Sequence, residues 1–225
     1  ALPVPDYYAL NGENAWMSFL QNDYLESKLL KAEALRYQFL EKYITPNRKK
    51  APIMSKNNKE IKKVLVLGDF TEKQTDLMLR DLEVVVEKYN FVAEYTLKPH
   101  PVSNINVSNY PKLKLAISNK PLQDIIDMFD VVFSSNTTSA GLDCFLMGME
   151  VVVFLDGNNL NFSPLKDVDG VKFVSNPFEL YSQLNSGVHC RDDSKINNFF
   201  WIDRDLPKWQ EIIRKVEVLE SNKIS

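Results

Sequence analysis

The sequence predicts an α/β fold with a doubly wound, Rossmann-like parallel sheet. From residue 63 to about residue 205, short apolar runs alternate with segments of helical periodicity, the order expected of parallel strands joined by helices. The first run, residues 64–67, is apolar throughout and is typical of a strand buried on both faces. Hydrophobic residues make up 44% of the 225 positions, enough to build a sizeable core.

The expected elements follow one another along this segment. Strands are expected at residues 64–67, 95–97, 113–117, 131–133 and 151–155. Helices are expected at residues 74–89, from Pro121 onward, at residues 140–147 and, near the end of the chain, at residues 206–219. Strands and helices in alternation favour a single ligand-binding α/β domain.

Residues 1–45 predict a short α/β segment ahead of this domain. The pattern is strand, helix, short strand and helix, with a turn at Asn11-Gly12. This is too little chain to close a core, so we interpret it as the end of a preceding domain. Residues 46–62 are polar and basic, which indicates a linker or a solvated surface loop. The predicted division is 1–45, the linker 46–62, a ligand-binding domain at 63–205 and a C-terminal helix in 206–225.

The overall charge argues against nucleic acid as a partner. The formal net charge is −3, so the chain lacks the basic field that a nucleic-acid-binding protein usually carries. Any bound anion must be held by a few local groups. The start has no signal-peptide pattern, and no apolar stretch reaches the roughly 20 residues of a membrane span, which together predict a cytoplasmic chain.

Residues that suit an anion follow the second expected strand. Ligands of open parallel sheets bind outside the carboxyl ends of the strands, and here those positions hold Lys98, Pro99, His100 and Pro101. Each proline favours extended geometry in the residue before it. A cation beside an imidazole suits a phosphate, which the imidazole can bind or protonate near neutral pH. The alternative is a rigid loop with a structural histidine.

Six small polar residues lie between the fourth expected strand and a helix. They are Ser134, Ser135, Asn136, Thr137, Thr138 and Ser139. Backbone N–H groups, the helix dipole and the hydroxyls together make an anion site at such a helix start. The alternative is that these side chains only cap the helix.

Weaker candidates follow the first and fifth expected strands. Gly68 allows a ligand to approach the backbone closely, and Asp69 comes next to it. Asp156 is suited to a ribose or a base edge, or else belongs to a turn. The sequence contains neither GxGxxG nor a Walker A motif, which disfavours ordinary dinucleotide and P-loop sites. Its two DxD pairs do not follow buried strands, so no metal site is expected.

The order of these motifs resembles a known group of proteins. A KPHP segment after one strand, with a Ser/Thr-rich turn about one βα unit later, is similar to the C-terminal half of bacterial GT-B glycosyltransferases with an HP motif, both sialyltransferase-like and Kdo-transferase-like. The residues from Ser134 to Asp143, with Asp156-Gly157 and residues 161–165, resemble a surface carbohydrate biosynthesis family within that group. The resemblance covers about residues 63–205, while residues 5–43 resemble the end of the preceding acceptor domain.

The resemblance implies a metal-independent glycosyltransferase of bacterial surface polysaccharide synthesis that needs no cofactor. Its donor would be a nucleotide-sugar, which is a CMP-sugar in related sialyltransferases. Its acceptor would be a glycan or a lipid-linked molecule, reached by peripheral association with the inner membrane. His100 would be the catalytic residue, binding or protonating the donor phosphate. Ser135, Thr137 and Thr138 would hold that phosphate, and Gly68 and the residues after it would lie near the nucleotide. The base that activates the acceptor would come from the preceding domain, outside this chain.

Two other functions fit the same residues. A sugar-nucleotide epimerase of similar fold would take its acid and base carboxylates from the preceding domain. A non-catalytic interaction module would dock onto a partner subunit through the apolar surfaces of residues 1–43 and of the terminal helix. The sequence leaves both alternatives open.

Overall fold

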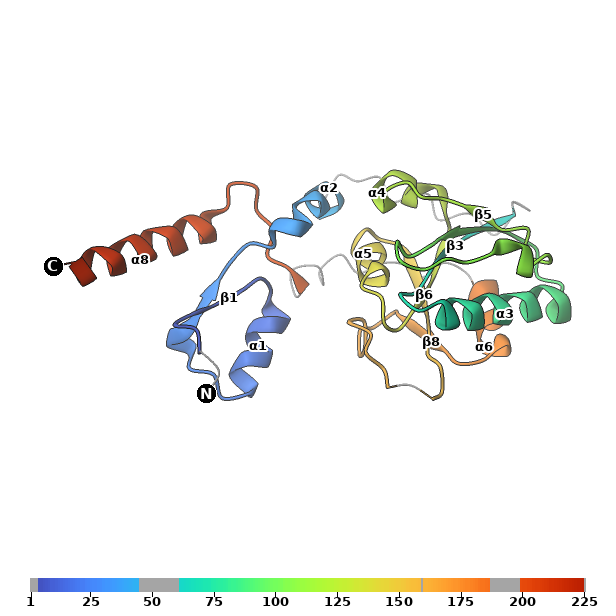
Figure 1. Ribbon diagram of the computed structural model, residues 1–225, viewed down its shortest axis with the longest axis horizontal. Coiled ribbons are helices and arrows are strands. Elements are labelled where there is room, and N and C mark those ends of the chain that lie inside the picture. Colours follow the sequence, from blue (N-terminus) through green and yellow to red (C-terminus); the bar gives the residue numbers. More distant parts are fainter. Residues whose placement is uncertain (1–3, 45–60, 159, 187–198, 225) are drawn as a thin grey trace. The chain divides into compact units, whose positions relative to one another are not determined.

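The computed structural model describes residues 4–44, 61–158, 160–186 and 199–224 and divides the chain into two compact units (Figure 1). Unit 1 comprises Ala1–Arg48 and Asp192–Ser225, and unit 2 comprises Lys49–Arg191. Each unit has its own sheet. The linker predicted at residues 46–62 lies almost wholly outside the described residues.

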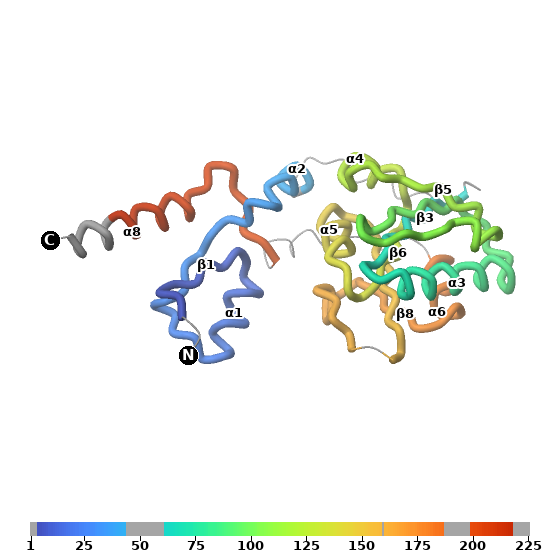
Figure 2. The backbone as a smooth tube through the Cα atoms, in the orientation of Figure 1, coloured from blue at the N-terminus to red at the C-terminus, as the bar shows by residue number. Residues whose placement is uncertain are grey.

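Unit 2 contains a six-stranded parallel sheet with the strand order β5-β4-β3-β6-β7-β8. The strands are β3 (Lys62–Leu67), β4 (Ala93–Lys98), β5 (Ala116–Ile117), β6 (Val131–Ser135), β7 (Glu150–Phe154) and β8 (Lys172–Val174). The first strand of the unit, β3, lies between the second, β4, and the fourth, β6, so the strand order reverses beside it. Figure 2 shows β3 next to β6. This is the doubly wound α/β fold that the sequence predicts.

Helices cover both faces of this sheet. They are α3 (Glu72–Tyr89), α4 (Leu122–Ile125), α5 (Ala140–Leu146) and α6 (Pro177–Asn185), with the 3-10 turns η3 (Val107–Asn109) and η4 (Ile126–Met128). α3 packs against α6 on one face, and α4 and α5 lie on the other (Figure 1). The apolar face of α3 buries Met78, Leu79, Leu82 and Val85, which share the spacing of one helix face.

The core of unit 2 lies between the sheet and these helices. Val64, Leu65 and Val66 of β3 are each 0% exposed, so this strand is buried on both faces, as predicted. Phe133 of β6 and Phe154 of β7 meet edge to face, with 6.2 Å between ring centroids. Burial stabilises such side chains by about 1.5–3 kcal/mol each relative to exposure. The central strands therefore fix the positions of the residues that follow them.

Two parts of unit 2 differ from the expectation. The strand expected at residues 113–117 is only the two-residue β5, because the backbone turns at Leu113, whose N–H donates to the carbonyl of Tyr110. Leu113 lies before β5, but its side chain is buried. Its apolar character therefore reflects burial in a turn and not a strand. β8 and α6 are not anticipated by the pattern, since β8 is three residues long and begins with a lysine.

Unit 1 is a small α/β unit formed by both ends of the chain. Its sheet pairs β1 (Tyr8–Leu10) with β2 (Leu29–Lys31) in parallel, and its helical elements are α1 (Glu13–Gln21), η1 (Glu26–Lys28), η2 (Leu35–Leu40), α2 (Glu41–Ile44) and α8 (Pro207–Ile224). Trp201 joins the two ends: its N–H donates to the carbonyl of Asn11 and its carbonyl accepts from the N–H of Ala34, both at 2.9 Å. The structure therefore groups the C-terminal residues with residues 1–48, in contrast to the predicted boundary at residue 205.

A buried carboxylate anchors α8 within unit 1. Glu33 is 1% exposed and accepts hydrogen bonds from the backbone N–H groups of Lys208 (2.9 Å) and Trp209 (3.0 Å) in the first turn of α8. The Trp209 indole in turn donates to the Glu33 carbonyl at 2.9 Å. Burial pushes the pKa of Glu33 upward, but the backbone hydrogen bonds outweigh burial and bring the pKa below its ordinary value. Glu33 is therefore a charged cap on this helix.

Candidate functional site

The register of unit 2 brings the candidate residues to one edge of the sheet. Leu67, the last residue of β3, pairs with Lys98 on one side and with Ser134 on the other. The residues that follow these three positions therefore leave the sheet together, at its carboxyl edge and on either side of the point where the strand order reverses. In doubly wound folds, ligands usually bind at this position, outside the carboxyl ends of the strands where the strand order reverses.

Asp69 is the centre of the polar cluster at this edge. Its side chain is buried, with the residue only 2% exposed. Oδ2 accepts hydrogen bonds from the hydroxyls of Ser135 and Thr137, and Oδ1 accepts from the backbone N–H and the hydroxyl of Thr71, at 2.8 and 3.0 Å. The backbone N–H of Asp69 donates to the Thr75 hydroxyl at 2.8 Å. The carboxylate thereby ties the end of β3, the start of α3 and the turn after β6 together.

These hydrogen bonds keep Asp69 ionised. Burial alone would raise the pKa of this carboxyl, because a low-dielectric surrounding disfavours the charged form. The hydrogen bonds from Ser135, Thr137 and Thr71 favour the charged form and outweigh burial, so the pKa lies below its ordinary value. At neutral pH the centre of the site is therefore an anion with its own set of donors.

In the Ser/Thr turn (residues 134–139), the first four side chains bond to or pack against other parts of the protein. Ser135 and Thr137 give their hydroxyl protons to Asp69. Ser134 is buried against α5, where a Cβ on Gly141 would lie 2.8 Å from its Oγ. Asn136 is also buried, and its Nδ2 donates to the carbonyl of Leu160 at 2.9 Å, which holds the loop after β7 against this turn.

The outer half of the turn is open to a ligand. Thr138 and Ser139 come after the residues bound to Asp69; Thr138 is half-buried and Ser139 exposed. Thr138 Oγ1 accepts from the N–H of Ala140 at 3.3 Å, which leaves its own proton available, and it partly fulfils the predicted capping role. Among the described residues, the Ser139 hydroxyl has no hydrogen-bond partner, so it can donate outward.

The segment after β4 packs tightly on the end of β3. The N–H of Gly68 donates to the Lys98 carbonyl at 2.9 Å. A Cβ on Gly68 would lie 3.0 Å from the backbone N of His100 and 3.1 Å from the Cα of Pro99, closer than ordinary contacts. Gly68 thus permits a close approach, as expected of the glycine, but in this structure the approaching group is protein backbone. Pro101 lies exposed in the turn that follows.

Two cationic or proton-bearing groups lie in this segment. The Lys98 ammonium donates to the carbonyl of Lys120 at 2.7 Å and keeps two further protons. His100 Nδ1 accepts weakly from the N–H of Val102, at 3.4 Å, which leaves Nε2 as the ring atom that can donate. Nε2 has no hydrogen-bond partner among the residues that the structure describes. His100 can therefore donate to a ligand from this atom.

Asp156 occupies a turn after β7. Its Oδ1 accepts from the backbone N–H and the Nδ2 of Asn158, both at 3.1 Å. This is the turn alternative given above for the residue. The register of β6 with β7 places the end of β7 beside the Ser/Thr turn, since Ser135 pairs with Phe154.

Three residues of the cluster were not among the candidates named from the sequence. Thr71 donates to the carboxylate of Asp69, the Thr75 hydroxyl accepts from the backbone N–H of Asp69, and Phe70, which precedes Thr71 in the sequence, has an exposed side chain. The available signal was the spacing of Asp69, Thr71 and Thr75 around the start of a helix, where short polar side chains bind backbone groups.

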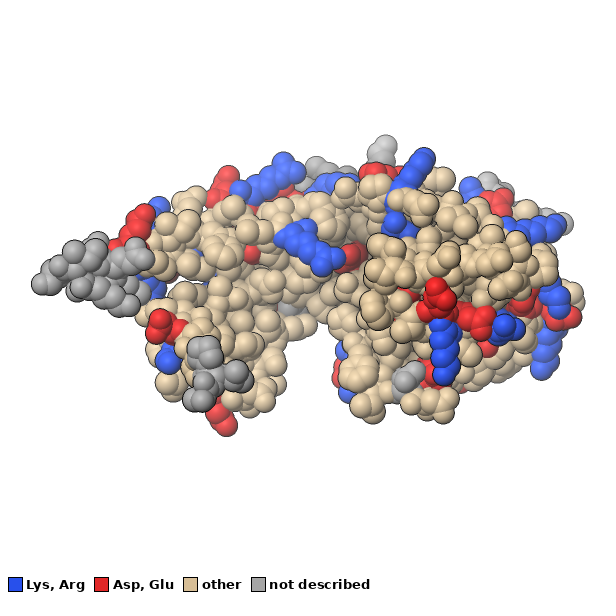
Figure 3. Space-filling model, in the orientation of Figure 1, with Lys and Arg blue, Asp and Glu red and all other residues tan. Residues whose placement is uncertain are grey.

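Neither the charge on the face of unit 2 drawn in Figure 3 nor metal-ligand chemistry among the described residues indicates a second site. Basic and acidic side chains are interspersed on this face (Figure 3). Within the described ranges, no three His, Cys, Asp or Glu side chains gather as a metal ion would require. The thiol of Cys144 is buried, and burial raises its pKa well above the ordinary value. No helix in the described part of the chain has the length and apolarity to cross a membrane.

The fold and the site together define a doubly wound α/β domain with a polar cluster at its switch point, and solved structures share the fold. The UDP-GlcNAc 2-epimerase of Methanocaldococcus jannaschii, in complex with UDP-GlcNAc and UDP, matches with a TM-score of 0.57 and 12% identity, over 95% of this chain and 61% of that chain. S. aureus MnaA with UDP matches with a TM-score of 0.53 and 12% identity, over 79% of this chain and 49% of that chain. No protein-family model and no curated protein sequence matches the chain.

The chain thus spans less than two thirds of the length of these structures. At this level of identity the likeness shows the fold, which is α/β, Rossmann-like and GT-B-like. The GT-B-like fold expected from the sequence resemblance is confirmed.

Proposed function

We propose that unit 2 binds a nucleotide-sugar through its phosphate and is the donor half of a bacterial GT-B glycosyltransferase of surface polysaccharide synthesis. The observation that carries the proposal is the position of His100 and of the Ser/Thr turn on either side of the β3 end, where the strand order reverses. The GT-B-like fold supports it.

The groups that face outward are the proposed phosphate ligands. His100 donates from Nε2, and Thr138 and Ser139 donate from their hydroxyls. Lys98 adds positive charge through its remaining ammonium protons. The hydroxyls of Ser135 and Thr137 serve a different role from the one implied by the resemblance, because Asp69 already takes their protons and they shape the turn instead.

The proposed reaction transfers the sugar from phosphate to an acceptor hydroxyl. The acceptor oxygen forms a bond to the anomeric carbon as the bond from that carbon to the phosphate oxygen breaks, and the nucleotide leaves with the electron pair. Lys98 and His100 stabilise the charge that develops on the leaving phosphate, His100 by donating a hydrogen bond from Nε2. No metal ion or cofactor has a part in this proposal.

The remaining partners follow from the same proposal. The base that accepts the proton of the acceptor hydroxyl belongs to a preceding domain. The acceptor is a glycan or a lipid-linked molecule, met by a cytoplasmic protein that associates peripherally with the inner membrane. CMP-sugars are candidate donors from the sequence resemblance, and UDP-sugars join them because the M. jannaschii structure holds UDP-GlcNAc and UDP.

Titration calorimetry of the whole chain with CMP, CDP and UDP tests the donor site. Wild-type protein should bind at least one of them, and His100→Ala should weaken binding about 10- to 150-fold, the effect of losing a charge-assisted hydrogen bond. Lys98→Ala should also weaken binding. Lys112→Ala is the matched control, because Lys112 pairs with Glu87 of α3 (2.5 Å). Failure of the wild type to bind any of the three nucleotides would overturn the proposal.

Product analysis separates transfer from isomerisation. An epimerase of this fold would convert a UDP-sugar into its isomer without an acceptor. Incubation of the protein with UDP-GlcNAc alone should leave the sugar nucleotide unchanged. Appearance of an isomerised UDP-sugar would replace the transferase by the epimerase.

A further inference from the structure

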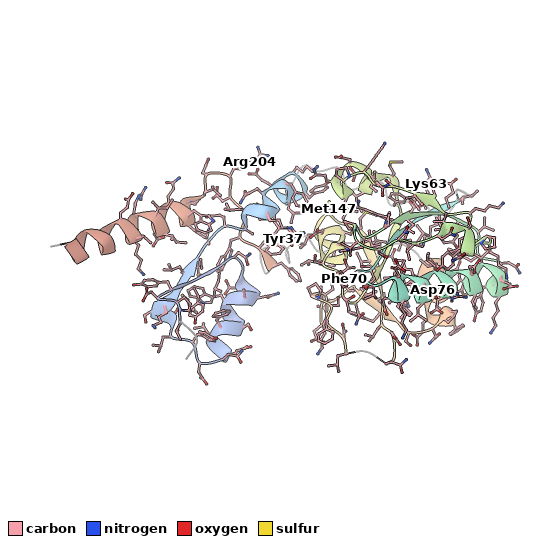
Figure 4. The ribbon with its side chains drawn as sticks, viewed as in Figure 1. Tyr37, Lys63, Phe70, Asp76, Met147 and Arg204 are labelled. Carbon is pink, nitrogen blue, oxygen red and sulfur yellow. The ribbon has the colours of Figure 1, made fainter. Side chains whose placement is uncertain are left out.

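We infer that Phe70 is a stacking platform for the nucleobase of the bound nucleotide, an inference that rests on the proposed function. Phe70 follows the buried end of β3 and the buried Asp69, yet its side chain is among the exposed apolar ones, with the residue 66% exposed. Figure 4 shows it beside the start of α3, at the carboxyl edge of the sheet. A single exposed apolar residue is common on protein surfaces, so its setting decides its role.

The backbone on both sides of Phe70 is held in place. Thr71 donates to Asp69 Oδ1 from its N–H and its hydroxyl, and the Asp69 N–H donates to Thr75. Asp69 is itself fixed to the turn after β6 through Ser135. The ring is thus presented by a hydrogen-bonded turn, and a ligand that stacks on it spends little free energy on ordering the loop.

The neighbour of the ring identifies the ligand. The rings of Phe70 and His100 meet edge to face, with centroids 5.7 Å apart and an interplanar angle of 78°. His100 is the proposed phosphate donor, and a nucleotide joins its phosphate to a flat aromatic base through one ribose. A phosphate on His100 therefore brings an aromatic ring to the neighbourhood of Phe70. The base extends an existing aromatic pair, and every base offers a π-face for stacking.

The experiment compares ligands with and without a base. In calorimetry with the whole chain, Phe70→Leu should weaken UDP and CDP binding about 5- to 150-fold, the range of one base–aromatic stack. Pyrophosphate, which has no base, should bind wild type and Phe70→Leu equally. Phe70→Trp should retain nucleotide binding because it keeps an aromatic face. Met128→Ala is the control, since Met128 is also exposed (61%) but precedes β6 at the opposite edge of the sheet.

A fluorescence measurement gives a second readout. The three natural tryptophans, Trp16, Trp201 and Trp209, all belong to unit 1, so Phe70→Trp places a fluorophore in unit 2. UDP should quench this added signal, and pyrophosphate should not.

Three outcomes would overturn the assignment. The first is unchanged UDP affinity in Phe70→Leu, and the second is equal weakening of UDP and pyrophosphate. The third is that Phe70→Leu binds UDP-GlcNAc no more tightly than UDP although wild type does, with UDP affinity itself kept. That result would assign the ring to the sugar. Each of these presupposes that wild-type protein binds UDP or CDP. If the wild type binds neither, the proposed function fails first, and the two failures are distinguished.

Discussion

The hydroxyl of Ser135, at the end of β6, donates to the buried carboxylate of Asp69, 66 positions earlier in the sequence at the end of β3. Thr137 donates to the same carboxylate. The polar cluster at the switch point therefore contains a negative charge of its own. A bound phosphate has to be held by groups whose protons this carboxylate does not accept, and Thr138, Ser139 and His100 are not among the partners of Asp69. Asp69 shapes the anion site without being an anion ligand.

Asp69→Asn should destabilise unit 2 by about 2–4 kcal/mol at pH 7. The amide replaces a charged acceptor of four hydrogen bonds in a buried position and adds two donors that face other donors. Urea unfolding followed by circular dichroism measures the loss. Asp124→Asn, at an exposed position of α4, is the control and should change the free energy of unfolding by less than about 0.5 kcal/mol.

The difference in free energy of unfolding between wild type and Asp69→Asn should depend on pH. The pKa of Asp69 is lowered from its ordinary 3.8 in the folded state, so the unfolded chain takes up the proton first as pH falls. The stabilisation from the carboxylate is therefore fully present above this value and is lost as pH falls through the lower, folded pKa. The difference between wild type and Asp69→Asn should stay constant from about pH 7 to pH 5 and narrow below about pH 4. A difference that does not vary down to pH 3 would contradict the role assigned to this carboxylate.

Gly68→Ala should both destabilise unit 2 and weaken nucleotide binding. The new methyl group meets backbone atoms of Pro99 and His100, which cannot rotate away as a side-chain end can. A cost of about 1–3 kcal/mol is expected for such overpacking, with the His100 segment displaced. Gly157→Ala is the matched control, because a Cβ there meets nothing within 4 Å. Urea unfolding and UDP titration of both variants check the prediction, and equal effects of the two substitutions would argue against it.

Much of the fold of unit 2 was predictable because its central strands contain uninterrupted apolar runs. Residues 64–67 and 131–133 lie within β3 and β6, and the residues after them meet at one edge, since parallel strands end together. β8 could not be found this way, because three residues with a lysine carry too little pattern. The association of Trp201 with Asn11 was also beyond the sequence, since backbone hydrogen bonds between distant segments leave no mark on composition.

The candidate site, like the fold, could be predicted from the sequence only in part. The Ser/Thr run and the KPHP segment indicate polar groups at strand ends, and this follows from residue type alone. Which hydroxyl serves the protein and which is left for a ligand depends on Asp69, whose partners come from two segments more than 60 positions apart, the start of α3 and the end of β6 with its following turn. The sequence placed Asp69 in the site as a weak candidate, but its role as the acceptor for Ser135 and Thr137 required the register of β3 with β6.

In unit 1, Glu33→Ala should loosen the C-terminal helix. Two backbone N–H groups at the start of α8 lose their acceptor in a buried position, which costs about 1–3 kcal/mol. Hydrogen exchange of the Lys208 and Trp209 amides should accelerate, while the amides of β3 in unit 2 keep their protection. Glu33→Gln retains an acceptor oxygen and should give an intermediate effect. Unchanged exchange at Lys208 and Trp209 in Glu33→Ala would show that the carboxylate does not hold this helix.

Asp81 of α3 should make unit 2 more stable in mild acid than at neutral pH. Burial raises the pKa of this half-buried carboxyl from 3.8 to about 6, so the folded state holds its proton longer than the unfolded chain does. The free-energy cost of keeping the ionised Asp81 carboxylate in the folded state is absent below about pH 4, grows as pH rises and is complete above about pH 6. The free energy of unfolding of Asp81→Asn should therefore exceed that of wild type by roughly 1 kcal/mol at pH 7.5, a value reduced for solvent screening of this half-buried group. The two free energies should be equal at pH 4. Urea unfolding at both pH values checks this against Asp124→Asn, and an NMR titration midpoint near 4 for Asp81 would contradict it.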